Sequence, residues 1–219
     1  MEGKMKAFGI VEPFKTFGPL EADIPQIGPL DALCEPVACA ACSSDPHQVH
    51  AGLPAGLVLG HEAAARIVET GSAVKLFKPG DIVAVGAVTP DYLTTEVQDS
   101  IPQHSGGLFG GMNWCTVENG TFAQYFRIRQ VDMNACLIPE GLTYEHAVLA
   151  ADMCTTGFHG AELADIQFGD TVVVCGIGPV GLMAVAGAAL RGAGRLIAIG
   201  NRPQTMELAK EYGATDTLN

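Results

Sequence analysis

The sequence predicts an α/β protein in which a mainly β domain is followed by the first half of a doubly wound parallel sheet. As far as Pro139, short β-prone runs are separated by turn residues. Beyond that residue, helical patterns begin and then alternate with short apolar strands. Because such an alternation builds a parallel sheet covered by helices, we expect two domains, residues 1–150 and 151–219.

The β domain is expected to be irregular, with short strands. Its clearest β-prone runs are residues 58–59, 65–69, 82–88 and 122–128. The stretch 92–119 is rich in Ser, Gly, Gln and Asn and has no sustained hydrophobic period. We therefore expect that stretch to be an excursion of loops and short helices.

The second domain is expected to begin with helices and to continue as β-α-β-α-β. One helix carries Glu145, Ala147 and Leu149 and leads into Asp152, and a second covers 156–163. The elements expected after these are strand 171–175, helix 180–191, strand 195–199, helix 204–212 and a third strand near Asn219. This order predicts half of a doubly wound nucleotide-binding domain.

Composition and charge exclude several classes of protein. With 48% hydrophobic residues the 219-residue chain is too apolar for intrinsic disorder, and its net charge of −12 repels nucleic acid and anionic membranes. No secretory signal opens the sequence, so we expect a cytoplasmic location. The uncharged stretch 171–190 has the length of a membrane span, but its glycines and Pro179 favour a buried strand, a turn and a helix.

Seven cysteines stand at irregular spacing, an odd number that makes a disulfide framework improbable. No four of them cluster closely in the sequence as the ligands of a structural zinc do. Any zinc is therefore expected to be catalytic.

A glycine turn follows the expected strand 171–175. Its residues are Gly176, Ile177, Gly178, Pro179, Val180 and Gly181. They match GxGxxG between a strand and a helix, where the glycines permit a tight turn, a close pyrophosphate and close packing. The alternative is a glycine-rich loop that binds no ligand.

The end of the next strand favours NADP over NAD. Gly200, Asn201 and Arg202 stand where an NAD-binding unit usually carries a carboxylate for the ribose hydroxyls. A small residue leaves room for a 2′-phosphate, and a guanidinium can pair with it in a bidentate manner. The alternative is that Arg202 is a surface residue at the start of a helix.

The β domain contains candidate metal ligands of three chemical types. Cys42, His61 and Glu62 offer a thiolate, an imidazole and a carboxylate. Zinc suits that mixture, and a catalytic zinc takes three protein ligands and keeps an open position. Taken singly, a cysteine or a histidine is more often an ordinary packing or surface residue.

Longer motifs carry a resemblance to a known family. GHEAAARIVETGSAVKLFKPGDIV at 60–83 resembles the GHE segment of zinc-dependent medium-chain dehydrogenases. ADMCTTGFHGAELADI at 151–166, GIGPVGLMAVAGA at 176–188 and LRGAGRLIAIGNRP at 190–203 resemble its NADP-dependent secondary alcohol (isopropanol) dehydrogenase branch. The resemblance covers nearly the whole chain. It implies a GroES-like catalytic domain followed by an incomplete Rossmann domain.

The resemblance also implies roles for individual residues. Cys42, His61 and Asp152 would bind the catalytic zinc, and Glu62 would be a fourth ligand or exchange with substrate. Ser44 would pass the alcohol proton towards solvent. His47 would extend that relay, or else be a plain structural histidine.

The implied activity is hydride transfer between NADP(H) and a small secondary alcohol or ketone, aldehydes included, by a homotetramer. Zinc would lower the pKa of the bound alcohol. Two alternatives remain at this stage: a truncated, catalytically silent zinc- or nucleotide-binding fragment, and a zinc-independent NADPH reductase of the same superfamily. The retained Cys42, His61 and Asp152 count against the second.

The sequence departs from the branch at several points. Ala65 replaces a glycine of the GHE segment, and the stretch 47–61 is shorter than in close relatives. Met112 stands where the branch has a tryptophan lining the small substrate pocket, with Trp114 two positions later. Family members also continue well beyond Asn219, so we expect a C-terminally truncated chain.

Overall fold

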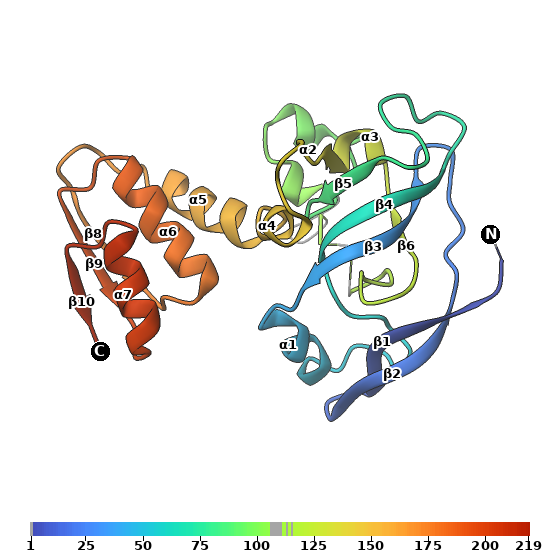
Figure 1. Ribbon diagram of the computed structural model, residues 1–219, viewed down its shortest axis with the longest axis horizontal. Helices are drawn as coiled ribbons and strands as arrows, with labels where there is room; N and C mark the ends of the chain where they lie inside the picture. Colours follow the sequence, from blue (N-terminus) through green and yellow to red (C-terminus); the bar gives the residue numbers. More distant parts are fainter. Residues whose placement is uncertain (1, 106–110, 113, 115) are drawn as a thin grey trace. The chain divides into compact units, whose positions relative to one another are not determined.

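The computed structural model describes residues 2–105, 111–112, 114 and 116–219. Its internal contacts divide the chain into two compact units, Met1–Ala151 and Asp152–Asn219. Both units are drawn in Figure 1.

The first unit is mainly β. Its strands are β1 (Lys4–Glu12), β2 (Thr16–Asp23), β3 (Ala32–Ala40), β4 (Glu62–Thr70), β5 (Ile82–Val85), β6 (Phe126–Ile128) and β7 (Ala135–Leu137). Its helices are α1 (Ser44–His50), α2 (Thr95–Gln98), the 3-10 turn η1 (Pro102–His104), α3 (Val131–Asn134) and α4 (Tyr144–Leu149). Strands β1 and β2 form a hairpin, and the other five form an antiparallel sheet in the order β6-β3-β4-β5-β7.

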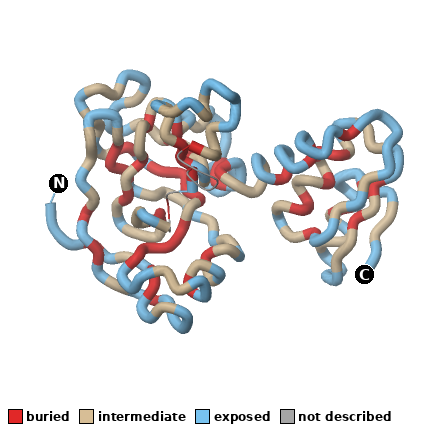
Figure 2. The backbone as a smooth tube through the Cα atoms, turned by 180° about the vertical axis from the view of Figure 1, so that it is seen from behind, coloured by how far each residue is buried: buried red, intermediate tan, exposed pale blue. Residues whose placement is uncertain are grey.

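The core of the first unit lies on that five-stranded sheet. Ile67, Val83, Val85 and Phe126 are each no more than 1% exposed, and Figure 2 shows segments of buried residues running through the first unit. Removing side chains of this size from water contributes roughly 1.5–3 kcal/mol each. The sheet is therefore a firm base for residues at the ends of its strands.

The segment just before β4 is held from both sides. The Ile10 amide donates to the Leu57 carbonyl at 2.9 Å, and the Gly120 amide donates to the Val58 carbonyl at 2.9 Å. A Cβ on Gly120 would lie 2.1 Å from the Gly60 carbonyl oxygen, so only glycine permits this approach. The chain thus enters β4 along a fixed path.

The second unit contains a three-stranded parallel sheet and three helices. These elements are α5 (Met153–Leu163), β8 (Thr171–Cys175), α6 (Pro179–Leu190), β9 (Arg195–Ile199), α7 (Pro203–Glu211) and β10 (Asp216–Leu218). The strand order is β10-β9-β8, with parallel pairing throughout. Right-handed crossovers place α6 and α7 on one face of the sheet (Figure 1).

Helices α5 and α6 pack closely through glycine. A Cβ on Gly157 would lie 2.5 Å from the Met183 Cβ and 2.6 Å from the Val180 carbonyl oxygen. One on Gly187 would lie 3.0 Å from the Ala161 Cβ. These small residues let the two helices approach closely, so the position of α5 in its unit is well defined.

The expected α/β fold class is confirmed, with differences at the level of elements. Strands 171–175 and 195–199 have the expected bounds. The helix expected at 156–163 begins earlier, at Met153, because Asp152 occupies the N-cap position. Only 126–128 of the run 122–128 forms sheet strand, since the residues before it pair with β1 and with the loop that leads into β4.

The uncharged stretch 171–190 divides into β8, a turn and α6, as expected. Across the residues that the structure describes, no helix is both long enough and apolar enough to cross a bilayer. Within the excursion 92–119, the structure describes α2 and η1, while 106–110, 113 and 115 lie outside the described residues.

Candidate metal centre and nucleotide-binding turn

The four expected ligands come together. One ligand atom from each of Cys42, His61, Glu62 and Asp152 lies within 4.8 Å of the other three. The set contains a sulfur, an imidazole nitrogen and two carboxylate oxygens, which are the donor types that zinc takes in proteins. The residues present therefore fit a zinc ion.

Strand pairing brings the first three ligands together. Ala40, the last residue of β3, pairs with Glu62, the first residue of β4. Cys42 follows Ala40 by two residues and His61 directly precedes Glu62, so both lie at the same end of this strand pair. Antiparallel register places these parts of the chain close in space although they are far apart in sequence.

Burial distinguishes the Glu62 carboxylate from an ordinary surface acid. Glu62 is 0% exposed, and its Oε1 lies 3.8 Å from the His61 Nε2. The His61 side chain is 12% exposed. Because burial of a charged carboxylate costs several kcal/mol unless opposite charge compensates it, this arrangement favours a cation among these groups.

Asp45 also belongs to the site, although the sequence predicted no role for it. Its Oδ2 accepts the Cys42 amide at 2.9 Å, and its Oδ1 lies 3.3 Å from the His61 Nδ1. Asp45 is 5% exposed. A carboxylate against one imidazole nitrogen orients the ring so that the other nitrogen can bind a metal. The sequence signal was an aspartate three residues after the cysteine.

Asp152 is the first residue of the second unit and follows Ala151 directly in the chain. The Ala87 amide donates to the Ala151 carbonyl at 3.0 Å, which fixes the backbone from which Asp152 extends. Asp152 is the N-cap of α5, yet its side chain makes no capping hydrogen bond. Its Oδ1 instead accepts a hydrogen bond from the Thr156 hydroxyl.

Ser44 lies beside the ligand group. Its Oγ is 3.5 Å from the His61 Nε2, at the first residue of α1. His47 is three residues further along α1, and its side chain is exposed to solvent. The relay expected through Ser44 and His47 remains a prediction.

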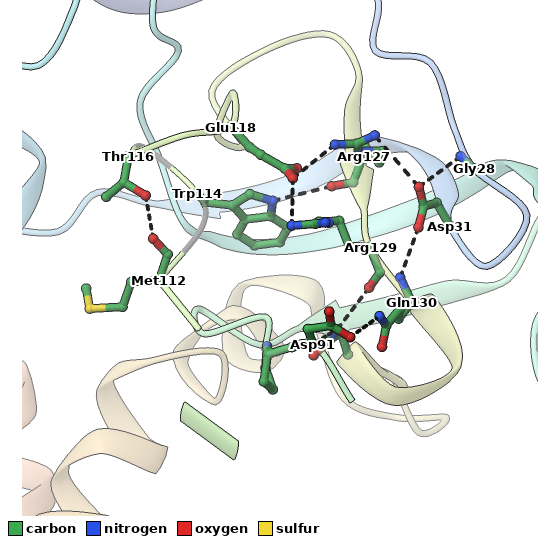
Figure 3. Close-up of polar contacts among 12 residues, drawn as sticks. Gly28, Asp31, Asp91, Met112, Trp114, Thr116, Glu118, Arg127, Arg129 and Gln130 are labelled. Atoms are coloured by element: carbon green, nitrogen blue, oxygen red, sulfur yellow. Dashed lines mark hydrogen bonds and ion pairs between the residues drawn. The ribbon is translucent and has the colours of Figure 1, made fainter. Parts of the chain in front are cut away.

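Trp114 packs in the core of the first unit. It is 3% exposed, its ring meets Phe126 edge to face with centroids 5.6 Å apart, and its Nε1 donates to the Arg127 carbonyl at 3.3 Å. Met112 is 46% exposed and points away from Trp114 in Figure 3. Trp114 is thus a core residue, and Met112 is the accessible one of the two.

A polar network fixes the two ends of the excursion (Figure 3). The Gln130 amide group donates to Asp91 Oδ1 at 2.7 Å, and the Gln130 backbone amide donates to Asp31 Oδ1 at 3.1 Å. Glu118 accepts both Arg127 at 3.0 Å and Arg129 at 3.2 Å. The hydrogen bond from Gln130 is the main cause that lowers the pKa of the Asp91 carboxyl below its ordinary value.

The glycine turn has the backbone geometry that its motif requires. Gly176 has a φ of +86°, which side chains disfavour, and a Cβ on Gly181 would lie 1.9 Å from the Gly176 carbonyl oxygen. Gly178 is the N-cap of α6 and Pro179 opens that helix. The turn thus presents the amino end of a twelve-residue helix, the place where proteins hold phosphates.

Residues after β9 lie beside the turn. A Cβ on Gly200 would lie 2.3 Å from the Ile177 Cγ1, and a Cβ on Gly178 would lie 3.7 Å from the Arg202 Nη2. Arg202 is the exposed N-cap of α7, next to the exposed Asn201. The structure therefore brings the expected residues of both cofactor motifs together within the second unit.

Comparisons with known proteins agree with this reading. The chain matches the alcohol dehydrogenase GroES-like domain family over residues 28–140, more than half of its length. It is 52% identical to the NADP-dependent isopropanol dehydrogenase of Thermoanaerobacter brockii, over 98% of this chain and 62% of that protein. It is 49% identical to the protein of that name in Entamoeba histolytica, over 100% of this chain and 61% of that protein.

Solved structures show the same relationship. Zinc dependent alcohol dehydrogenase 2 from Streptococcus pneumonia, in its apo form, aligns with a TM-score of 0.87 and 28% identity, over 98% of this chain and 61% of that one. A putative zinc-binding dehydrogenase from Sinorhizobium meliloti, bound to NADP, aligns with a TM-score of 0.78 and 29% identity, over 99% and 62%. The chain spans 62% of the length of the isopropanol dehydrogenase from Thermoanaerobacter brockii. It belongs to the alcohol dehydrogenase GroES-like domain family.

Proposed function

We propose that this chain carries the zinc centre and part of the NADP site of an oxidoreductase that transfers hydride between NADP(H) and small secondary alcohols or ketones, aldehydes included. The observation that carries the proposal is the convergence of Cys42, His61, Glu62 and Asp152 within 4.8 Å. The names of the relatives in Thermoanaerobacter brockii and Entamoeba histolytica support both the cofactor and the substrate class.

In the proposed mechanism, Cys42, His61 and Asp152 hold zinc, with Glu62 as a fourth ligand or exchanging with substrate. Bound zinc supplies a Lewis acid that lowers the pKa of an alcohol, and bound NADP supplies the hydride acceptor. Asp45 keeps the His61 ring in one orientation through its contact with Nδ1 at 3.3 Å. The same carboxylate holds the backbone of Cys42 at 2.9 Å, so one residue positions two ligands.

Ser44 is the proposed acceptor of the alcohol proton. Its hydroxyl lies 3.5 Å from the His61 Nε2 and therefore next to the ligand atoms. A hydroxyl can accept one proton while donating another. His47, exposed on the same helix, is the proposed next group towards solvent.

The glycine turn and Arg202 are the proposed cofactor contacts of this chain. Backbone amides at the start of α6 would bind the pyrophosphate. The Arg202 guanidinium, close to Gly178, would bind the 2′-phosphate, with Gly200 and Asn201 leaving space for it. The preference for NADP is expected to come from Arg202 in particular.

A second candidate is a catalytically silent zinc- or nucleotide-binding fragment of such an enzyme. The chain spans 62% of the length of the relative in Thermoanaerobacter brockii. The zinc-independent reductase is disfavoured because all four ligand side chains are present and converge. A homotetramer in the cytoplasm remains a prediction from the resemblance and the sequence.

Zinc content and turnover distinguish these functions. We expect the purified chain to bind one zinc ion and to oxidise NADPH when acetone is added, because ligands and cofactor turn are both present. Zinc is measured by atomic emission and NADPH by its absorbance. A folded chain with zinc but without turnover would support the silent fragment, and a folded chain without zinc would contradict the proposed metal centre.

Replacement of Arg202 tests the cofactor preference. Arg202→Ala should weaken NADPH binding by about tenfold or more and leave NADH binding almost unchanged, because only the former has a 2′-phosphate to pair with the guanidinium. Fluorescence titration with each cofactor measures this. Arg195→Ala is the matched control, since Arg195 pairs with Asp216 instead. An equal effect on both cofactors would refute the assignment.

Replacement of Asp45 tests the positioning of His61. Asp45→Asn keeps the shape of the side chain but removes its charge, so zinc affinity should fall by about 10- to 100-fold. Competition with a chromophoric chelator measures the affinity. Asp132→Asn is the control, since Asp132 accepts the Lys75 and Leu76 amides at 2.8 and 2.9 Å in a different loop. Similar zinc affinity in both variants would rule out the role of Asp45.

A further inference from the structure

We propose that Thr156 is a positioning residue that fixes the orientation of the Asp152 carboxylate as a metal ligand. The inference rests on the proposed zinc centre and adds to it a hydroxyl with a defined task. The contact that motivates it is the hydrogen bond from the Thr156 Oγ1 to the Asp152 Oδ1.

The geometry at the start of α5 is unusual for an aspartate in that position. An N-cap aspartate normally accepts a backbone amide from the first helical turn. Asp152 is the N-cap but makes no such bond through its side chain. Its carboxylate is instead part of the ligand group with Cys42, His61 and Glu62. The Asp152 side chain thus lacks the capping bond to a backbone amide of α5.

Two neighbouring threonines donate hydrogen bonds to oxygen atoms of Asp152. The Thr155 hydroxyl donates to the Asp152 backbone carbonyl at 2.9 Å. The Thr156 hydroxyl donates to the carboxylate, while the Thr156 amide donates to the same carbonyl at 2.7 Å. Since residues four apart lie on one face of a helix, Thr156 is placed directly over the Asp152 side chain.

Packing between α5 and α6 fixes the part of α5 that carries the Thr156 hydroxyl. Gly157, the next residue, is buried in the close contact between α5 and α6, where a Cβ would lie 2.5 Å from the Met183 Cβ. This contact fixes the helical turn that carries Thr156. The hydroxyl therefore holds the carboxylate from a rigid element within the second unit.

An aspartate needs such a partner more than a cysteine does. A carboxylate has two oxygens and can bind a metal through one or both, in several orientations. A hydroxyl donating to Oδ1 is a charge-assisted hydrogen bond that limits rotation of the carboxylate plane. We infer that Thr156 selects one binding geometry of Asp152 and so raises metal affinity.

The test measures metal affinity in the full 219-residue chain. Thr156→Val removes the hydroxyl with little change in shape, and Thr155→Val is the matched control from the same helical turn. Zinc affinity is measured by competition with a chromophoric chelator, and the Co²⁺-substituted chain is compared by its visible absorption spectrum. Circular dichroism establishes that each variant is folded.

We expect Thr156→Val to weaken zinc binding by about tenfold or more and to change the Co²⁺ spectrum. Thr155→Val should change neither the zinc affinity nor the Co²⁺ spectrum. Thr156→Ser, which keeps a hydroxyl, should have the zinc affinity and the Co²⁺ spectrum of the unsubstituted chain. In an Asp152→Ala background, Thr156→Val should have no further effect, because the hydroxyl then has no ligand to orient. If the effect of Thr156→Val depends on Asp152, the Thr156 hydroxyl acts by positioning that carboxylate and not by stabilising helix α5 in general.

Three results would overturn the proposal. Equal zinc affinities for Thr156→Val and Thr155→Val would show that the hydroxyl does not orient the ligand. If Thr156→Val lowered zinc affinity as much in the Asp152→Ala background as in the unsubstituted chain, the Thr156 hydroxyl would act on a group other than Asp152. If the unsubstituted chain bound no zinc, the proposed metal centre itself would fail, which distinguishes that failure from a failure of Thr156 alone.

Discussion

Electrostatic repulsion among closely spaced ligand groups is the constraint on which the candidate site depends. Cys42, Glu62 and Asp152 can each carry a negative charge, and their ligand atoms lie within 4.8 Å of one another. At that separation and an effective dielectric constant of about 20, each like-charged pair costs on the order of 3 kcal/mol. A divalent cation reverses the sign of this term, so the arrangement is stable when a metal ion is bound.

The surrounding fold keeps these groups from moving apart. The antiparallel register that pairs Ala40 with Glu62 brings Cys42 and His61 to the same end of two strands. Hydrogen bonds from Ile10 and Gly120 hold the segment that leads into His61. Cys42 and His61 lie within two residues of the paired ends of β3 and β4, and Glu62 is the first residue of β4. The site is therefore preorganised by backbone contacts.

The sequence predicted the second unit more completely than the first. Strands 171–175 and 195–199 have the expected bounds because apolar β-branched runs between glycines leave few alternatives. By contrast, β3 was not expected. It contains Pro36, which removes a ladder hydrogen bond, and the structure accommodates it with an irregularity between Pro36 and Ala38. Pairing between strands that are distant in the sequence produces no hydrophobic period from which β3 could have been predicted.

Within the site too, some residues could be predicted from the sequence and others could not. Cys42, His61, Glu62 and Asp152 could be named because their residue types and the surrounding motifs indicate ligands. Asp45 and Thr156 could not, because aspartate and threonine are common at the starts of helices. Their roles depend on which atom each side chain faces, and only the folded chain shows that Asp45 lies 3.3 Å from the His61 Nδ1.

The proposed metal centre has one cysteine, one histidine and two carboxylates around a zinc ion. X-ray absorption at the zinc edge of the zinc-loaded chain tests it most directly, because sulfur and lighter ligands scatter differently. We expect a single sulfur at about 2.3 Å and the remaining ligands, nitrogen or oxygen, at about 2.0–2.2 Å. Two or more sulfur ligands, or none, would contradict it.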